Sequence, residues 1–254
     1  QSFPGGNTGI ARHFVKKLNP DAIDGTSFEE VLFGRIAFDQ LDREDKPVRM
    51  RLNSTAVSIE HTSQVNGNEQ VQITYAKNGE LNQLKAKAVV MATGGWVNRN
   101  VLKDLPSEYH GAYGKFGHSP VLVANVALTN WRFLERLGVS AAIWPEGFGF
   151  TCNIRRPMIV DGKSQPLHPD KPIVLTFYTP IFKPGLERKE QGAVGRAELL
   201  STSFTDYERQ IREQMTIMFS AGGFDPAKDI AGIILNRWGH AYVNPDLGFM
   251  FGAD

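Results

Sequence analysis

The spacing of apolar residues predicts two short helices at the start of the chain. After a Gly-rich turn, apolar residues recur at helical spacing up to Leu18, with Asn7 or Thr8 as the expected cap and Pro20 closing the helix. Residues 27–40 repeat this spacing and carry two glutamates in the first turn, where the helix dipole favours them. We therefore expect this part of the chain to be helical.

Alternation of apolar and polar residues then predicts a small antiparallel meander. Asn66-Gly67 and Asn78-Gly79 are strong turn signals between its strands. The expected strands are residues 48–52, 56–60, 70–75 and the polar return 80–87. One face of such a meander is exposed to water.

Residues 87–92 form a continuous apolar run, which is typical of a strand buried on both faces of a mainly parallel sheet. The run ends in Thr93-Gly94-Gly95, where the backbone can approach a ligand closely. Two interpretations stay open, a strand end beside a dinucleotide and a plain buried strand with a glycine turn. A GxGxxG fingerprint between a strand and a helix would decide, and the sequence has none, since the glycines after Pro4 follow no strand.

From about residue 106 the chain is rich in aromatic residues and mixes helical and strand patterns. The expected elements are a helix at 121–137, a strand at 173–178, a loop at 180–195, an amphipathic helix at 206–219 and a short apolar strand at 230–235 that leads into 236–242.

Composition narrows the class of protein. The 254 residues carry 28 Lys and Arg against 27 Asp and Glu, a net charge of +1 that favours neither nucleic acid nor an anionic membrane. The single Cys152 excludes an internal disulfide and a multi-cysteine zinc site, and the six histidines lack metal-ligand spacing, so no metal is expected. No run approaches the roughly 20 apolar residues of a membrane-spanning helix. Both chain ends look like loop sequence, and we expect a piece of something larger.

Four stretches together resemble the flavin-containing amine oxidase superfamily, and most closely its spermidine dehydrogenase-like branch. They are Phe3-Pro-Gly-Gly-Asn-Thr-Gly9, Ala88-Val-Val-Met-Ala-Thr-Gly-Gly-Trp-Val-Asn98, Asn125-Val-Ala-Leu-Thr-Asn-Trp-Arg-Phe133 with Cys152-Asn-Ile-Arg-Arg-Pro157, and Asn236-Arg-Trp-Gly-His-Ala-Tyr242. They follow the family's order over nearly the whole chain. The resemblance implies an α/β (α+β) fold that is part of an FAD/NAD(P)-binding amine-oxidase-type fold, with a β-meander and a substrate domain of mixed sheet and helices.

The same resemblance implies a domain organisation. Residues 1–105 would be part of the FAD-binding domain, 106–235 the substrate domain, and 236–254 a return segment toward the FAD domain. The family's N-terminal glycine fingerprint and its last FAD-contacting segment are absent. We therefore expect another polypeptide to supply them, and expect this chain alone to bind FAD poorly.

Candidate site residues follow from the resemblance, each with a structural alternative. Val57 would contact FAD through its backbone, and Ala92, Thr93 and Gly94 would close against the cofactor; plain sheet and turn positions are the alternative. The candidates for an amine cavity are Trp144, Phe148, Tyr178, Trp238 and Tyr242, whereas most aromatic rings of this region are expected to be core.

Three further residues have open roles. His240 is the candidate catalytic residue, as a proton acceptor or by orienting a water, or else a hydrogen-bonded structural histidine. Arg155-Arg156 can hold a carboxylate or phosphate, but we interpret the pair as a solvated turn. Cys152 is expected to be a buried, inert thiol.

The function implied is a part or subunit of an FAD-dependent oxidoreductase that oxidises a small-molecule amine, a polyamine among the candidates, by hydride transfer to flavin N5. The alternatives are a non-catalytic subunit or degenerate fragment that binds a partner chain or small molecule, and an isomerase or cyclase with the same fold. The sequence leaves the compartment open, with a cytoplasmic one preferred.

Overall fold

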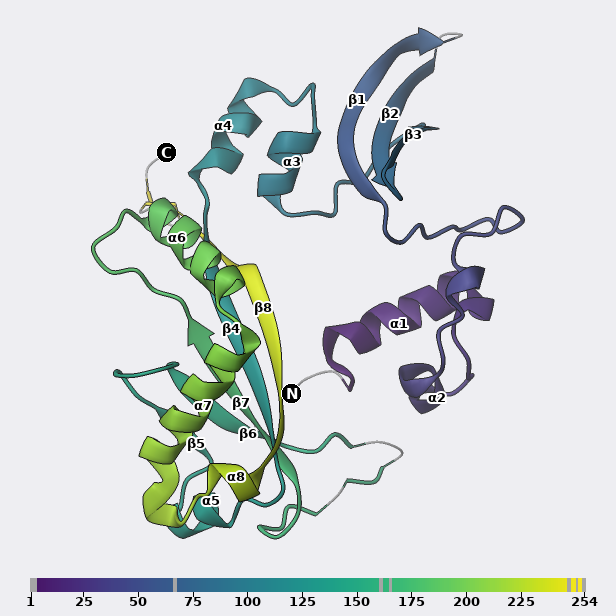
Figure 1. The fold of residues 1–254 in the computed structure, drawn as a ribbon. Coiled ribbons are helices and arrows are strands. Elements are labelled where there is room, and N and C mark those ends of the chain that lie inside the picture. Colours follow the sequence, from purple (N-terminus) through teal and green to yellow (C-terminus); the bar gives the residue numbers. More distant parts are fainter. Residues whose placement is uncertain are drawn as a thin grey trace. The chain divides into compact units, whose positions relative to one another are not determined.

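The computed structural model describes residues 4–65, 68–159, 162–164, 166–245, 248–249 and 251–252. The chain divides into two compact units, one of residues 1–114 with 158–163 and one of residues 115–157 with 164–254 (Figure 1). We describe each unit by itself.

The first unit begins with two helices, as predicted, but the second is shorter than its pattern. Helix α1 (Gly6–Leu18) has Gly5 as its N-cap, in the left-handed region at φ 76°, with no side-chain cap, so the prediction of Asn7 or Thr8 as cap was wrong. Helix α2 (Phe28–Phe33) ends at Gly34, a position that requires glycine because an added Cβ would lie 2.2 Å from the Asp24 carbonyl oxygen. The 3₁₀ turn η1 (Pro20–Ala22) follows α1, and the 3₁₀ turn η2 (Phe38–Gln40) replaces the end of the second helical pattern.

The meander is confirmed for its later strands. Strands β1 (Thr55–Val65), β2 (Asn68–Lys77) and β3 (Glu80–Ala86) form an antiparallel sheet in the order β1-β2-β3. Asn78 and Gly79 have φ values of 53° and 82°, which suits a tight hairpin turn. The turn predicted at Asn66-Gly67 lies outside the described residues.

Residues 48–52 were predicted as a strand and are a loop instead. Charge pairing decides this, because the Arg49 and Arg51 side chains both bind the Asp42 carboxylate, with Nε–O distances of 2.7 and 3.1 Å. The Met50 amide also donates to the Leu41 carbonyl oxygen at 2.7 Å. The segment is thereby tied to the preceding turn and not to a strand.

The buried strand predicted at residues 87–92 was also wrong. The segment is irregular, and the Val90 side chain is 90% exposed. A strand requires a hydrogen-bonded neighbour, and within the described part of the chain no strand pairs with this segment. Helices α3 (Gly95–Val101) and α4 (Ser107–Lys115) follow it.

The second unit is built on one five-stranded antiparallel sheet with the order β5-β6-β7-β4-β8. Its strands are β4 (Gly117–Leu128), β5 (Ala141–Ile143), β6 (Thr151–Arg155), β7 (Ile173–Pro180) and β8 (Ile230–Asn244). The strand predicted at 173–178 is confirmed as β7. The strand predicted at 230–235 is longer than expected, since β8 continues through the next segment.

The segment predicted as a helix at 121–137 is a strand up to Leu128. β4 ends at Leu128, and only α5 (Arg132–Leu137) is helical. A continuous apolar run fits both a helix and a central strand. Here β4 is hydrogen-bonded on both sides, to β7 and to β8, and its valines suit the extended backbone.

Helices complete the second unit after β7. They are α6 (Arg188–Ser201), α7 (Phe204–Phe219) and α8 (Pro226–Asp229), with the 3₁₀ turn η3 (Ser220–Gly222) before α8. The amphipathic helix predicted at 206–219 is confirmed as α7. The loop predicted at 180–195 is wrong from Arg188 onward, because α6 begins there.

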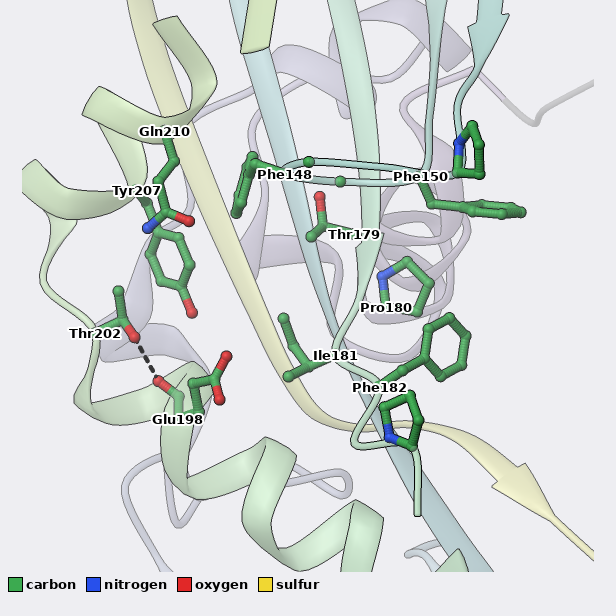
Figure 2. A pocket seen from close by; sticks show the side chains of 14 residues that line it. Phe148, Phe150, Thr179, Pro180, Ile181, Phe182, Glu198, Thr202, Tyr207 and Gln210 are labelled. Atoms are coloured by element: carbon green, nitrogen blue, oxygen red, sulfur yellow. Dashed lines mark hydrogen bonds between the residues drawn. The ribbon is translucent and has the colours of Figure 1, made fainter. Parts of the chain in front are cut away.

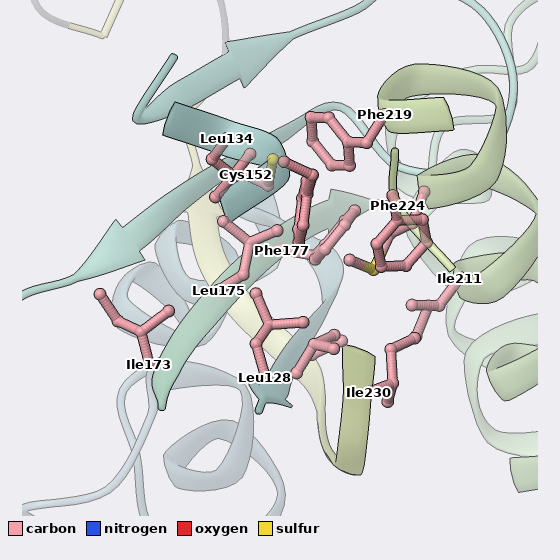
Figure 3. Packing of buried hydrophobic residues seen from close by; sticks show 14 of the residues in the cluster. Leu128, Leu134, Cys152, Ile173, Leu175, Phe177, Ile211, Phe219, Phe224 and Ile230 are labelled. Atoms are coloured by element: carbon pink, nitrogen blue, oxygen red, sulfur yellow. The ribbon is translucent and has the colours of Figure 1, made fainter. Parts of the chain in front are cut away.

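The main core lies between one face of this sheet and α7 (Figure 3). Ile211, Met215 and Phe219 of α7 pack against fully buried strand residues such as Leu175 and Phe177. Burying apolar area is the chief stabilising force here, at roughly 25 cal/mol per Å². The cores of the first unit are smaller clusters, one among the N-terminal helices and one around Ile59 of β1.

The fold is therefore mixed α/β with antiparallel sheets. Residues 87–92 implied a mainly parallel sheet, but the described strands pair in antiparallel fashion. In the described part of the chain, parallel pairing is limited to an isolated bridge between Ile59 and Leu102. None of the described helices is both long and apolar enough to cross a membrane.

Candidate functional site

The residues proposed to contact a flavin lie in the first unit, and Val57 occupies a distinctive place on β1. The register between β1 and β2 passes from Ala56 opposite Tyr75 to Ser58 opposite Thr74. Val57 is thus an extra residue, a β-bulge, which takes its backbone out of the regular ladder. Its side chain is exposed.

Ala92, Thr93 and Gly94 form the turn that leads into α3. All three are exposed, and the Thr93 hydroxyl donates to the Asn98 side-chain oxygen at 2.5 Å. The Gly94 carbonyl oxygen accepts from the Val97 and Asn98 amides, so this turn is well defined.

The segment before this turn lies against β1. Val89 and Met91 belong to the apolar cluster of Ile59, so the turn and the Val57 bulge are carried by packed neighbours. The bulge at Val57 and the exposed turn are both accessible to a ligand. No glycine fingerprint accompanies them in the sequence.

In the second unit, the strand alternation separates two faces of the five-stranded sheet. Helices α6 and α7 cover one of them through Leu122, Leu199 and Tyr207 and through the main core. We call the opposite one the open face. Its positions are Thr151, Asn153 and Arg155 on β6; Val174, Thr176 and Tyr178 on β7; Val121, Val123, Asn125 and Ala127 on β4; and Gly232, Ile234, Asn236 and Trp238 on β8.

A connected set of polar side chains crosses the open face. The Arg155 guanidinium donates through Nε to the Thr176 hydroxyl at 3.1 Å and through Nη2 to the Tyr178 hydroxyl. The Thr176 hydroxyl in turn donates to the Asn125 side-chain oxygen at 2.7 Å. The guanidinium carbon also lies 5.6 Å from the centre of the Tyr178 ring, within the range of a cation–π contact.

Trp238 shares this open face, since it lies opposite Val121 on β4. Its side chain is 57% exposed. Tyr242 lies opposite Ser119, and its side chain is also exposed to solvent. Between them, β8 has an irregular register, and His240 lies in that irregularity.

His240 packs against a second histidine. Its ring and that of His118 meet edge to face with centroids 5.0 Å apart. Partial burial, then the positive Arg196 and then His118 lower the pKa of His240, and burial followed by Arg196 lowers that of His118. Both imidazoles are therefore favoured in the neutral form, which can accept a proton.

Trp144 and Phe148 lie on the helix-covered side, away from Tyr178. Trp144 is only 8% exposed and packs edge to face on Phe177 with centroids 5.7 Å apart. Its indole Nε1 donates to the Phe148 carbonyl oxygen at 3.0 Å. The Phe148 amide donates to the Gln214 side chain at 3.0 Å. The five predicted rings are thus not one cluster, and Tyr178 and Trp238 share the open face.

A pocket of about 480 Å³ opens on the helix-covered side (Figure 2). Phe148, Phe182 and Tyr207 supply aromatic walls, and Glu198 supplies a carboxylate. Burial raises the pKa of the Tyr207 hydroxyl, and the Glu198 carboxylate is paired with Lys183. The carboxylate of this pocket is thus already neutralised by a lysine. Phe148 is the predicted site residue that lines it.

Two residues of the polar network were missed or misjudged from sequence. Arg155 was interpreted as part of a solvated turn, but it is the last residue of β6. Thr176 was not a candidate site residue, and its side chain is fully buried. Alternation in residues 151–155, with Cys152 and Ile154 as the apolar positions, was the signal that could have placed Arg155 on a sheet face. Cys152 is buried as expected, and burial raises its thiol pKa to about 12.

Among the residues that the structure describes, no group of three or more His, Cys, Asp or Glu side chains could hold a metal ion.

Comparisons with known proteins give structural similarity only. No protein-family model matches the sequence, and no curated protein matches it. Cyclohexylamine oxidase from Brevibacterium oxydans IH-35A is similar with a TM-score of 0.47 and 13% identity, over 73% of this chain and 34% of that one. Putrescine oxidase bound to putrescine is similar with a TM-score of 0.48 and 13% identity, over 77% of this chain and 38% of that one. The chain thus spans about a third of the length of these amine oxidases and is structurally similar to part of them.

Proposed function

We propose that this chain is part of an FAD-dependent oxidoreductase that oxidises an amine. FAD, when bound, supplies the acceptor for a hydride equivalent from the carbon next to the amine nitrogen. Two lines support the proposal: the family-like order of the four sequence stretches, and the chemistry of the open face.

The observation that carries the proposal is the composition of the open face. Its side chains are aromatic, aliphatic, amide and hydroxyl groups with one cation and no carboxylate. The one cation of this face, Arg155, disfavours a second positive charge nearby, so a bound amine is favoured in its neutral form. The neutral amine is the form that gives up a hydride, and this step needs no protein base.

We assign the roles as follows. Tyr178 and Trp238 hold the amine against aromatic surface, with Tyr242 beside them on β8. His240 accepts a proton or orients water for hydrolysis of the imine. Val57, Ala92, Thr93 and Gly94 contact the flavin cofactor. Trp144 and Phe148 act from the other side of the sheet, as support for β6 and β7 or as the wall of a second cavity.

The test begins with the whole protein and added FAD. Flavin binding is followed by the visible absorbance and fluorescence of the flavin, and amines are then added without oxygen. We expect loss of the oxidised flavin spectrum with an amine substrate. Trp238→Ala should lower the rate of flavin reduction at limiting amine about 10-fold or more, as for other aromatic anchors. Ile217→Ala, an exposed residue of α7, is the matched control. Failure to take up flavin under any condition would contradict the proposal.

One observation favours a second candidate, a subunit that binds a partner polypeptide. The apolar segment at residues 87–92 has no strand partner within the described chain, and Val90 is almost fully exposed. Such a partner could also contribute to flavin binding. Self-association or partner binding without any flavin uptake would favour this second function over the first.

A further inference from the structure

Arg155 is oriented by its neighbours in a way that an ordinary surface arginine is not. Arg155 lies opposite Val174 on β7, and its side chain extends past Thr176 to the hydroxyl of Tyr178. Because Thr176 is fully buried and already bonded to Asn125, it offers a fixed anchor to the guanidinium. The ring of Tyr178 provides a second fixed contact. The guanidinium is thus held in one place on the open face.

The held guanidinium still has donors to offer. Of its five N–H groups, one Nε and one Nη2 proton are used by Thr176 and Tyr178. Within the described residues, no hydrogen bond or ion pair takes the remaining Nη protons. Two such protons on a planar fork match the two oxygens of a carboxylate.

The charge on the open face also favours a carboxylate. Arg155 is the one charged residue among the open-face positions defined above, and no acidic side chain balances it. A single guanidinium matches one negative charge. A carboxylate carries one, whereas a phosphate carries more and is normally held by several donors or cations. Apolar surface for the rest of a ligand lies on the same face, where Ile234 is 67% exposed and Trp238 is 57% exposed.

We propose that Arg155 is a carboxylate-binding residue, and that the amine oxidised on this face carries a carboxylate, as an amino acid does. Naming the ligand a substrate rests on the proposed function, whereas carboxylate binding does not. Tyr178 and Thr176 are positioning residues for the guanidinium. A plain polyamine has no group that uses Arg155.

Three small ligands that share one ring test the site directly by calorimetry on the whole protein at low salt. 3-Phenylpropionate has the carboxylate alone, 2-phenylethylamine has the amine alone, and phenylalanine has both. We expect 3-phenylpropionate and phenylalanine to bind. Arg155→Gln should weaken both by about 10- to 100-fold, as expected for hydrogen bonds to a charged group, and leave 2-phenylethylamine unchanged. Added salt should lower the affinity for the two ligands that carry a carboxylate.

Matched variants separate charge, geometry and position. Arg155→Lys keeps the charge but loses the fork, so its affinity should fall between those of the wild type and Arg155→Gln. Tyr178→Phe removes the hydroxyl anchor and should weaken binding several-fold. The neighbouring Arg156→Gln is the control, because Arg156 is exposed and makes no hydrogen bond within the described part of the chain. Thermal unfolding checks that each variant folds.

The outcomes distinguish this inference from the proposed function. Carboxylate binding that is equal in the wild type and Arg155→Gln would overturn the inference, as would inorganic phosphate that binds as tightly as 3-phenylpropionate. Oxidation of phenylalanine that Arg155→Gln does not change would overturn it and leave the proposed function standing. Binding that depends on Arg155 without any amine oxidation would support the site and contradict the proposed function.

Discussion

At the scale of single residues, side chains of the same type have different roles on the two faces of the five-stranded sheet. Trp144 and Trp238 are both tryptophans of the second unit, yet one is buried in the main core and the other lies on the open face. A buried ring contributes to the free energy of folding through packing, whereas an exposed ring is free to contact a ligand.

Truncating the two tryptophans should separate these roles. Trp144→Ala removes core packing and the hydrogen bond to the Phe148 carbonyl oxygen, and should lower the free energy of unfolding by about 3–5 kcal/mol. Trp238→Ala should lower it by less than about 1 kcal/mol. Urea unfolding measures both values. Equal losses would mean that Trp238 is also covered, and would remove it from the open face.

The histidine pair predicts how stability depends on pH. The pKa of His240 and that of His118 are lower in the folded state than the ordinary value near 6.5. Below that value the unfolded state therefore binds more protons, so the free energy of unfolding should fall as pH drops through and below 6.5. Above it the pair contributes no pH dependence.

His240→Gln should reduce this loss of stability in mild acid, since glutamine keeps a donor and an acceptor but does not titrate. If His240 acts in turnover, the same variant should flatten the pH profile of the rate, whose midpoint lies below 6.5. Thermal unfolding and rates over a pH series check both. His110→Gln, on α4, is the control. A profile unchanged from wild type would mean that His240 is structural.

At the scale of elements, α7 combines a sequence-readable cap with the main core contact. The Ser203 side chain accepts a hydrogen bond from the Asp206 amide at 3.1 Å, which satisfies one of the free donors at the helix start. The helix then buries Ile211, Met215 and Phe219 against the sheet. Loss of the cap therefore destabilises a helix that contributes to the main core.

Ser203→Ala should lower the free energy of unfolding by about 1 kcal/mol, because the amide loses its acceptor. Thr205→Ala is the matched control, since Thr205 lies exposed in the same first turn and makes no hydrogen bond through its side chain in the described structure. Its effect should stay within about 0.5 kcal/mol. A larger effect at Thr205 than at Ser203 would contradict the cap.

At the scale of the whole molecule, the two units differ in the size of their cores. The second unit has one large cluster that joins β4, β6, β7 and β8 with the helices α5 and α7, whereas the clusters of the first unit hold three or four buried residues each. Resistance to local opening follows the amount of apolar surface that opening would expose.

Amide hydrogen exchange should therefore be slowest in the central strands of the second unit. We expect β4 and β7 to be protected longer than β1, β2 and β3, with the segment at residues 87–92 exchanging fastest because its backbone has no strand partner in the described chain. Mass spectrometry of peptides after exchange measures this order. Slow exchange at 87–92 would indicate a partner strand.

The sequence by itself determined those elements whose signal is local. The α1 and α7 patterns, the Asn78-Gly79 hairpin and the meander strands are each specified by residues close together in the chain, since helical spacing, turn residues and alternation act within a few positions. The burial of Cys152 could also be read from its apolar surroundings.

Tertiary structure decided the rest, because a strand and its faces are defined by neighbours that are distant in sequence. The apolar run of β4 is a strand because β7 and β8 lie on either side of it, whereas the equally apolar run at 87–92 has no such neighbour among the described strands. Arg155 illustrates the same point at the candidate site. Its residue type was visible in the sequence, but the anchors on Thr176 and Tyr178 exist only because β6 pairs with β7, and those hydrogen bonds turn a surface cation into an oriented one.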